Sequence, residues 1–317
     1  MLCPNGIGLP NPTLLETTRM KKIHTDTCPI CGTKGGTKYL TCSDHYATGE
    51  RFDLVRCERC GFICTQDFPD EAEIGRYYES ADYVSHSDTR RGLMNKVYHL
   101  VRRLMLARKA DMVEGLVPPR DGRRVLDIGC GTGYFLATMK ERGWQTLGVE
   151  KNALARESAT THFGLTTLSD LREVSTDERF DVISLWHVME HLQDLQFVFA
   201  RLRTLLAEGG ALVVALPNCS SYDAAYYGAD WGAYDVPRHL WHFEPATFSR
   251  LARREGFKIE KFAPMPFDAF YVGMLSERYA GRSLPFVRGL WRGAVALKHS
   301  LRDPKKSSSI IYVLRRI

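Results

Sequence analysis

The feature that constrains this chain most is the segment VLDIGCGTG at 125–133, a short apolar run that leads into alternating glycines. Gly129, Gly131 and Gly133 remove every Cβ from one face of the turn, so a bulky ligand can lie against bare backbone. If a helix starts at this turn, its first amides face the anionic groups of that ligand. The segment therefore predicts a strand, a ligand-binding turn and a helix in that order.

The spacing of these glycines separates two classes of ligand. A dinucleotide loop reads G-x-G-x-x-G around a pyrophosphate, whereas this chain reads G-x-G-x-G and has Asp127 just before it. An acid there repels a pyrophosphate but receives the ammonium group of a methionine moiety, directly or through water. Glu150 ends the next apolar run, where a carboxylate accepts hydrogen bonds from ribose hydroxyls. The alternative is a tight turn with no ligand.

Strand and helix patterns alternate from residue 123 onward, which is typical of a mainly parallel sheet. Strands are expected in RRVLDIG, TLGVE, LTTLSDL, FDVISLWHV, ALVVALPN, KIEKFA and SSSIIYVLRRI. The helix over 194–210 is expected to end at its glycine pair. The predicted fold is α/β and Rossmann-like, with a mainly parallel seven-stranded sheet and helices on both faces.

These residues also carry a family resemblance. D-I-G-C-G-T-G followed by V-E-K resembles the first two motifs of class I methyltransferases that use S-adenosylmethionine. The likeness continues through FDVISLWHVMEHLQD, LVVALPN and DVPRHLWHFEPATFSRLARREGF, which are similar to the Methyltransf_23-type group, and it covers residues 123 to about 263. The resemblance implies that Asp127, Gly129 and Gly131 contact the methionine end of the cofactor, Glu150 its ribose and Asp170 its adenine amino group. Gly133 completes the predicted cofactor loop.

Two C-x2-C knuckles, each followed by glycine, precede this region: Cys28 with Cys31, and Cys57 with Cys60, with 25 residues between the pairs. Four thiolates in that arrangement predict a closed, structural zinc site, and metal binding would supply much of the folding energy of so small a module. The alternative is four unrelated buried thiols. The pattern also resembles the zinc-binding segment ahead of methyltransferase domains in sugar-modifying enzymes, which implies a structural or acceptor-covering role. The competing ligands are Cys42, His45 and Cys64.

The pattern along the chain predicts its organisation. No apolar run is long enough to span a membrane, and the N-terminus lacks the features of a secretory signal. A reducing cytoplasm is therefore expected, where nine cysteines indicate metal ligands or buried thiols rather than disulfides. The expected parts are a mobile tail (1–23), a zinc-knuckle module (24–68), a helical linker with a basic helix (69–115) and the methyltransferase domain (116–317), which includes an acceptor lid (218–243) and an insert before the last strand (264–306).

Two histidines are candidates for a catalytic base. His187 follows the fourth strand, whose carboxyl end borders the ligand crevice of a parallel sheet, and His239 follows the expected lid. A neutral imidazole could take a proton from a hydroxyl acceptor, with His187 narrowly favoured. The alternative is that Glu190 and His191 merely start a helix. Ubiquinone-pathway O-methyltransferases have Glu in place of His187 and can hold a divalent ion with it, so this substitution counts against metal-assisted catalysis.

Aromatic residues are dense between the fifth strand and the next helix, where they indicate either an acceptor lid or a satellite core over the sheet edge. Arg238 there would suit an anionic group. The linker has seven Lys or Arg and no Asp or Glu over 90–109. Leu93, Val97, Leu100, Val101 and Leu104 share one face of a helix there, which indicates a core-packing helix with a solvated basic face. Contact with RNA phosphates or an anionic membrane is the alternative.

The sequence thus favours methyl transfer from S-adenosylmethionine to a small molecule, most simply O-methylation of a glycan, a sugar nucleotide or a lipid-linked intermediate. The first alternative is an RNA methyltransferase that grips RNA with the zinc module and basic helix, although no Asn/Asp-Pro-Pro-Tyr/Phe motif follows the fourth strand. The second is a non-catalytic, cofactor-binding regulatory subunit. The sequence does not predict an oligomeric state.

Overall fold

A computed structural model describes residues 22–78 and 93–317 of the chain. The tail expected over 1–23 lies outside the described residues, except for Lys22 and Ile23, which form strand β1 and pair with β5 (Phe68–Pro69). Of the expected helical linker, the structure describes a short 3-10 helix (Ile74–Tyr77) and the helix α2 (Leu93–Glu114).

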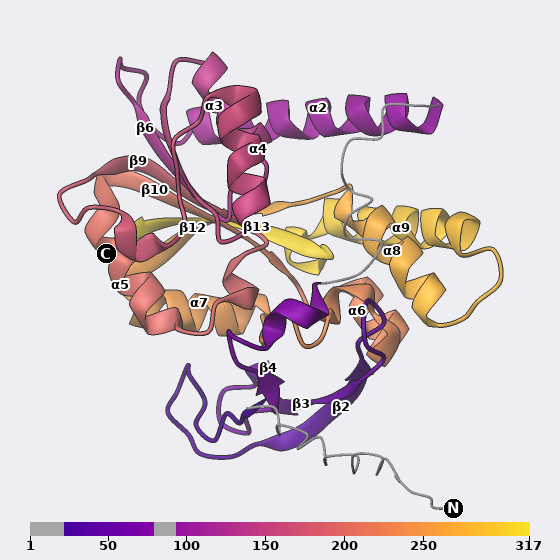
Figure 1. Cartoon of the computed structure of the whole chain (residues 1–317). Helices are drawn as coiled ribbons and strands as arrows, with labels where there is room; N and C mark the ends of the chain where they lie inside the picture. The colour runs from indigo at the N-terminus through magenta and orange to yellow at the C-terminus, as the bar shows by residue number, and fades with distance from the viewer. Residues whose placement is uncertain (1–21, 79–92) are drawn as a thin grey trace, which may run out of the picture.

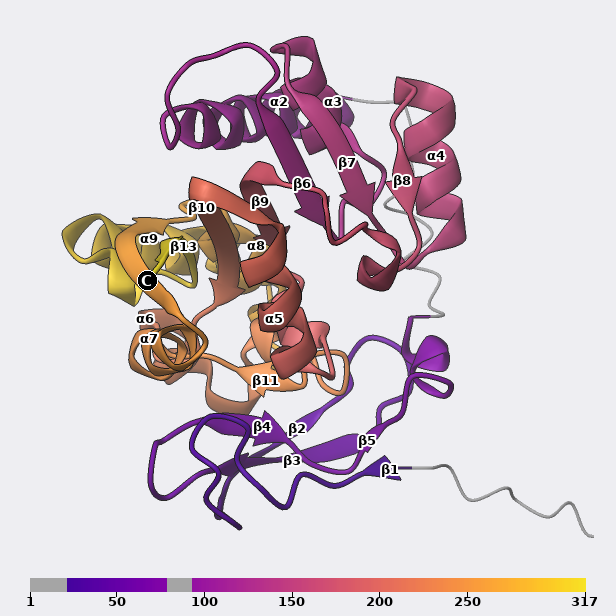
Figure 2. The ribbon, with the colours of Figure 1, turned by 90° about the vertical axis from the view of Figure 1, so that its left-hand side faces the viewer.

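A seven-stranded sheet with the order β12-β13-β10-β9-β6-β7-β8 forms the centre of the molecule (Figure 2). The five strands β8, β7, β6, β9 and β10 run parallel, whereas β13 is antiparallel to both of its neighbours. This arrangement confirms the predicted mainly parallel, Rossmann-like sheet. The strands are β6 (Arg124–Ile128), β7 (Gln145–Val149), β8 (Thr167–Leu168), β9 (Phe180–Trp186), β10 (Leu206–Pro217), β12 (Phe257–Pro264) and β13 (Ser309–Arg316).

Helices cover both faces of this sheet (Figure 1). Alternate residues along each central strand point to opposite faces, so Leu126 packs with helices α5 (Leu195–Leu205) and α7 (Pro245–Arg254). Its neighbour Val125 packs with α2, α3 (Tyr134–Glu141) and α4 (Ala153–Phe163) on the other face. The two hydrophobic clusters fix the strand ends, and with them the loops that follow.

The N-terminal module is joined to the domain with the seven-stranded sheet by a second, shared sheet. Its strands β2 (Thr37–Ser43), β3 (Arg51–Arg56) and β4 (Ile63–Thr65) are extended by β11 (Trp241–His242), which comes from the segment expected to form the lid. A buried ion pair, 3.1 Å between Arg238 and Asp44, links the two parts again. The module is therefore part of one structure with the domain that it precedes.

The segment 218–243 folds as helix α6 (Tyr222–Tyr227), two 3-10 turns (Gly228–Asp230 and Gly232–Tyr234) and β11. Its aromatic side chains are mostly buried: Trp231 and Tyr234 pack with Phe52, Leu54 and other residues of the module. These packed side chains correspond to the satellite core, which was the alternative to an acceptor lid in the sequence analysis. Arg238 is fully engaged inside it, because its guanidinium also bonds Asp235 and the carbonyl of Tyr77, so it does not offer a free cation to an anionic group.

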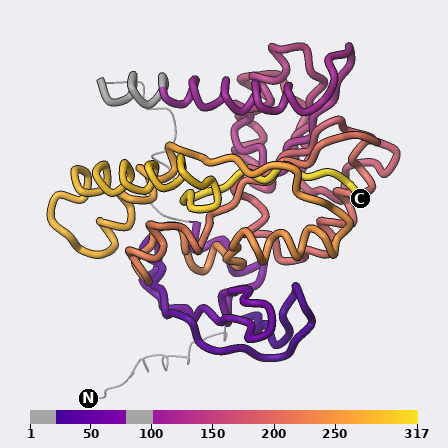
Figure 3. The backbone as a smooth tube through the Cα atoms, turned by 180° about the vertical axis from the view of Figure 1, so that it is seen from behind, coloured from indigo at the N-terminus to yellow at the C-terminus, as the bar shows by residue number. Residues whose placement is uncertain are grey.

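The insert between β12 and β13 is a hairpin of two helices, α8 (Asp268–Tyr279) and α9 (Pro285–Arg302), followed by a 3-10 turn (Pro304–Lys306). The hairpin extends away from the sheet, as the view from behind shows (Figure 3). Within the described residues, no helix is both long enough and apolar enough to cross a membrane.

Two expectations about helices are wrong in detail. Helix α5 ends at Leu205, and the glycine pair at 209–210 lies within β10, where the pairing with β9 shifts register between Leu206 and Ala211. On α2, Leu104 is 45% exposed, while Ala110 and Val113 form the buried contacts. Of the predicted apolar face, the structure describes the side chains of Val101 and Leu104, and Leu104 does not pack.

Candidate functional site

A cavity of about 640 Å³ lies along the carboxyl ends of β6, β7, β8 and β9. Gly129, Glu150, Asp170 and Val188 line it, each from the loop that follows one of these strands. Residues 71–78 of the N-terminal part close another side of it. In open α/β sheets, ligands bind in this crevice, and three of the predicted cofactor residues, Gly129, Glu150 and Asp170, line it.

The three loop glycines have different roles. All have positive φ, which favours glycine. A Cβ on Gly129 would come within 2.3 Å of Val188, and one on Gly133 within 2.6 Å of Leu165, so both permit close packing of protein against the loop. Only at Gly131 does the Cβ direction meet nothing within 4 Å. The bare face expected at all three positions is therefore open at Gly131 alone.

Asp127 lies near the end of β6, two residues before Gly129, and is almost fully buried. Burial raises the pKa of its carboxyl group to about 7, although a 2.6 Å hydrogen bond from Ser184 and the charge of Lys109 lower it. Ionised Asp127 in such a low-dielectric site attracts a cation strongly. A bound ammonium group would in turn favour the ionised form of Asp127. The predicted contact between these two groups is therefore consistent with the raised pKa of Asp127.

Glu150 and Asp170 occupy the positions expected of ribose and adenine ligands, at the ends of the next two strands. Glu150 accepts hydrogen bonds from the amides of Gly131 (2.9 Å) and Asn152 (2.8 Å), which fixes its carboxylate against the glycine loop. Asp170 caps the following 3-10 turn through the amide of Arg172 and also pairs with its guanidinium at 2.9 Å. Their roles toward the cofactor remain predictions from the resemblance.

His187 directly follows β9 and has a left-handed backbone with φ of 57°, which is unusual for a residue other than glycine and is found mostly at functional sites. Its ring lies between two carboxylates, 3.0 Å from Asp268 and 3.4 Å from Glu190. Burial disfavours the charged ring, but the two carboxylates overcome this and raise the pKa of His187 to about 10. These contacts stabilise an imidazolium, not the neutral base that the sequence favoured.

Next to this pair lies a second cluster, formed by Glu190, His191 and His239. One ligand atom from each lies within 4.8 Å of the others. His191 Nδ1 donates to the carbonyl of Arg238, and His239 Nδ1 donates to that of Ala233, each at 2.9 Å. Because a carbonyl only accepts, the Nε2 atoms keep their lone pairs.

Glu190 completes this cluster with a buried carboxylate. Two imidazoles lie near the same oxygen of this carboxylate, His187 Nδ1 at 3.4 Å and His239 Nε2 at 4.0 Å. Although its burial opposes this, the positive charges around it lower the pKa of Glu190, and a bound cation would stabilise the buried carboxylate further. The arrangement of two imidazoles and one carboxylate, oriented by backbone carbonyls, is a donor set that suits a divalent transition metal. His239 thus lies where the sequence expected a base, although as part of this group.

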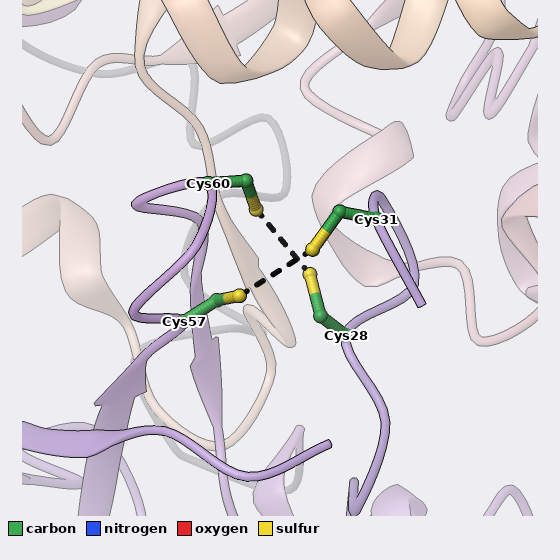
Figure 4. Close-up of side chains that lie close together, drawn as sticks. All are labelled: Cys28, Cys31, Cys57 and Cys60. Carbon is green, nitrogen blue, oxygen red and sulfur yellow. Dashed lines mark hydrogen bonds between the residues drawn. The ribbon is translucent and has the colours of Figure 1, made fainter. Parts of the chain in front are cut away.

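The four knuckle cysteines also converge (Figure 4). Their sulfur atoms all lie within 4.8 Å of one another, with 3.5 Å separating Cys28 from Cys60 and Cys31 from Cys57. Tetrahedral zinc with Zn–S bonds of about 2.3 Å requires sulfurs roughly 3.8 Å apart, so the cluster fits that ion. The competing residues take other places: Cys42 is buried in the satellite core, His45 stacks on Tyr279, and Cys64 accepts a hydrogen bond from Gln66.

The methyltransferase domain also holds these knuckles in place. Arg254 on α7 donates to the carbonyls of Pro29 and Ile30, both at 2.6 Å, and Arg250 donates to that of Cys60. Gly32 and Gly61, both with positive φ, each donate an amide hydrogen back to the first cysteine of their knuckle. The cluster therefore connects the module to α7 as well as closing its own turns.

Sequence reasoning missed Asp268 and Lys109. Asp268 begins α8, and Lys109 on α2 lies over the Trp186 ring at 4.2 Å. Burial lowers the pKa of Lys109, although Asp268 and Asp127 oppose this. Both residues come from segments that the sequence analysis assigned to a linker and an insert, and no local motif marks either. On the same helix, Arg102 and Arg108 lie over the rings of Tyr134 and Phe267, which is consistent with a packing role for the basic helix.

Comparison with known proteins adds an independent result. The family model Methyltransf_23, described as a methyltransferase domain, matches residues 99–261, just over half of the chain. A ubiquinone biosynthesis O-methyltransferase from Brucella melitensis is 30% identical over 135 residues, which cover 40% of this chain and 54% of the relative. Another with that name, from Glaesserella parasuis, is 27% identical over 191 residues, covering 55% of this chain and 79% of the relative.

The first of these curated relatives is thus matched over only about half its length. Among solved structures, a magnesium protoporphyrin IX methyltransferase from Synechocystis with bound SAH is 14% identical, with a TM-score of 0.49; the match covers 78% of this chain and all of that one. The sheet order, the glycine loop at its centre and the family match agree with one another. The chain belongs to the Methyltransf_23 family, whose model describes a methyltransferase domain.

Proposed function

We propose that the protein transfers the methyl group of S-adenosylmethionine to a hydroxyl oxygen of a small-molecule acceptor: a glycan, a sugar nucleotide or a lipid-linked intermediate. The observation that carries this proposal is the group of imidazoles and carboxylates beside the cofactor loop, where Glu190, His191 and His239 meet. A hydroxyl must lose its proton to become an effective nucleophile. The relatives named as O-methyltransferases support the same chemistry.

In the proposed reaction, Asp127 holds the ammonium group of the cofactor and Gly131 leaves room for its methionine end. The acceptor oxygen attacks the methyl carbon in line, the carbon–sulfur bond breaks, and its electron pair stays on sulfur as a thioether. The acceptor proton passes to the carboxylate oxygen of Glu190 that is not one of the cluster's ligand atoms. His187, held by Asp268, is a positioning residue that fixes Glu190 across a 3.4 Å contact. Alignment and exclusion of water supply much of the rate.

The fit of Glu190, His191 and His239 to a metal leads us to propose that these residues hold a divalent cation. Such an ion lowers the pKa of an oxygen bound to it, which promotes loss of the acceptor proton. His187 stands where the ubiquinone-pathway enzymes have a metal-binding Glu, which from the sequence alone is evidence against metal-assisted catalysis. In the structure, His239 offers a metal ligand from a distant segment instead. Metal content of the purified protein, compared with that of the His239→Gln variant, tests this assignment.

We also propose that the four clustered cysteines bind structural zinc. Four protein ligands leave no open coordination position, so this ion would have no direct part in methyl transfer. Its role is to fix the knuckles that Arg250 and Arg254 of α7 contact, and so to hold the module against the domain.

The test of the proposed function uses a deletion strain and labelled cofactor. Purified protein, deuteromethyl S-adenosylmethionine and separate glycan, small-molecule, lipid and RNA fractions of that strain are combined, and each is analysed by mass spectrometry. We expect one glycan, nucleotide-sugar or lipid species to gain one labelled methyl group on oxygen. Label in RNA alone would replace this proposal with the RNA alternative, and no transfer to any fraction would favour the regulatory one.

A further inference from the structure

Helix α9 packs against α8 through its smallest residues. Gly289, Gly293, Ala296 and Ser300 are the buried positions of this helix. A Cβ on Gly289 would lie 2.6 Å from the Cα of Met274, so the two helix backbones are in close contact. This face leaves no room for a bulky side chain. The large apolar residues of α9 must therefore point elsewhere.

Those large residues point into solvent. Phe286, Val287, Leu290 and Trp291 occupy neighbouring positions on the outward side of the first turns, and Trp291 is 68% exposed. Leu284, at the tip of the hairpin, is exposed as well. An amphipathic helix of a soluble domain normally buries its bulky apolar side chains and exposes its small or polar ones. In α9 this relation is inverted, and a contiguous exposed apolar patch of this kind marks an interaction site.

The charge around this patch is strongly positive. Residues 282–306 contain seven Lys or Arg and a single acid, Asp303; two of these cations, Arg282 and Arg288, pair with Glu277 of α8, which leaves the segment with a net positive charge. Farther along the outward face, Lys298 and Arg302 are exposed, and Lys305 and Lys306 follow in the next turn. A second copy of the chain docked on this patch would bring like charges together. An anionic partner with an apolar interior matches both the charge and the apolar side chains.

We propose that α9 is an interfacial helix that docks the protein on an anionic lipid bilayer, inserting Phe286, Val287, Leu290 and Trp291 at the level of the headgroups. Aromatic and aliphatic residues on one face with Lys and Arg beside them are the features that bind such surfaces. The helix is about 27 Å long at 1.5 Å per residue, so it can lie flat along the membrane.

The hairpin also connects this surface to the reaction site. Asp268, the first residue of α8, lies 3.0 Å from His187 at the carboxyl end of β9. The apolar residues lie toward the other end of this hairpin, so docking through α9 would hold Asp268 within about the length of α8, ~18 Å, of the docked surface. Membrane docking favours the lipid-linked class among the proposed acceptors. This choice of acceptor rests on the proposed function. Docking itself depends only on the surface of α9.

Vesicle sedimentation tests the docking without any methyl transfer. The full-length protein is mixed with vesicles of phosphatidylcholine alone or with about a third phosphatidylglycerol. We expect preferential binding to the anionic vesicles that weakens at high salt. The double variant Phe286→Ser/Trp291→Ser should bind at least about tenfold more weakly, because two inserted aromatic side chains are lost. Leu154→Ser, which removes an equally exposed side chain on α4, is the matched control.

Tryptophan fluorescence provides a second measurement on the same samples. Trp144, Trp231 and Trp241 are buried and Trp186 is only partly exposed, whereas Trp291 is 68% exposed, so quenching by brominated lipid should arise mainly from Trp291 and be lost in the double variant. The proposal would be overturned if the wild-type protein bound neither kind of vesicle, or if the double variant bound anionic vesicles as well as the wild type does. A salt-resistant dimer that the double variant converts to monomer would also overturn it, since a second copy would then cover α9.

Discussion

The cofactor half and the acceptor half of the site are built from different kinds of sequence. The cofactor half consists of loops that each directly follow one strand: Gly129, Glu150 and Asp170 of these loops line the cavity, and Asp127 and Gly131 belong to the first of these strand–loop units. The acceptor half meets the cavity at His191 and collects His187 from the end of β9, His239 from a segment that also extends the zinc module, and Asp268 from the helical insert. A local motif encodes the first half, whereas the second exists only after distant segments pack together.

The largest effect that would sharpen this comparison is expected from Gly131→Arg. The position has positive φ and an open Cβ direction, so the side chain should fill the methionine end of the cavity and abolish binding of S-adenosylhomocysteine. Calorimetric titration measures this affinity. Gly143→Arg is a matched control, because Gly143 also has positive φ and open space around its Cβ direction. Unchanged affinity in Gly131→Arg would contradict the assigned cofactor half.

A change in the acceptor half should separate turnover from cofactor binding. Glu190→Gln keeps the shape of the side chain but removes its charge, and we expect turnover to fall about 10²–10⁴-fold. Affinity for S-adenosylhomocysteine should change by less than about threefold, because Glu190 belongs to the other half. Glu141→Gln, at the exposed end of α3, is the control. If the affinity for S-adenosylhomocysteine falls together with turnover, Glu190 also contributes to cofactor binding, and the division into two halves is wrong.

The cysteine cluster offers a test of the module that supports the acceptor half. Replacing Cys28 and Cys60 by Ser should remove zinc and lower the stability of the module by several kcal/mol, because metal binding supplies folding energy in small modules. Metal analysis and thermal unfolding measure these effects. Cys64→Ala, which changes a buried neighbour that is outside the cluster, should keep the metal. Full zinc in the double variant would assign the ion to other residues.

The smallest effect concerns pH. Because the pKa of Asp127 is raised to about 7 from its ordinary 3.8, the residue is increasingly protonated below pH 7 and loses its attraction for the cofactor ammonium. Affinity for S-adenosylhomocysteine should therefore fall by up to about tenfold per pH unit below 7. In the free protein the sign is reversed: Asp127 favours folding less as pH rises from 3.8 toward 7. Asp127→Asn should remove both trends, and a persistent slope in titrations of that variant would assign them to another group.

This contrast also explains how much the sequence could predict. The strand pattern predicted the order of elements, and the strand–loop positions predicted that Gly129, Glu150 and Asp170 would meet at one cavity, because both depend on neighbours along the chain. The role of Asp268 could not be predicted, since its partner His187 lies on the far side of three strands and several helices in the sequence. Against the effect of burial, the contact with Asp268 raises the pKa of His187 and favours its protonated form. Without knowledge of this contact, the sequence alone predicted a neutral ring.

The zinc knuckles also show that local spacing can be predicted from the sequence, whereas contacts between distant segments cannot. Their spacing predicted which four cysteines meet, and the structure brings those four together. The sharing of a sheet between this module and β11 had no signal in the sequence, because Trp241 and His242 form only a two-residue strand. The aromatic segment before them therefore allowed two interpretations, and only tertiary packing decided that Trp231 and Tyr234 are core residues.

The central claim is that both halves serve one reaction site. A crystal structure with bound S-adenosylhomocysteine tests it most directly, through the distance from the cofactor sulfur to the Glu190 carboxylate and the His239 ring. We predict that the methionine end lies at Gly131 and that the nearer of these two groups is within about 8 Å of the sulfur, which leaves space for one methyl group and an acceptor oxygen. A sulfur farther than that from both groups would contradict the account.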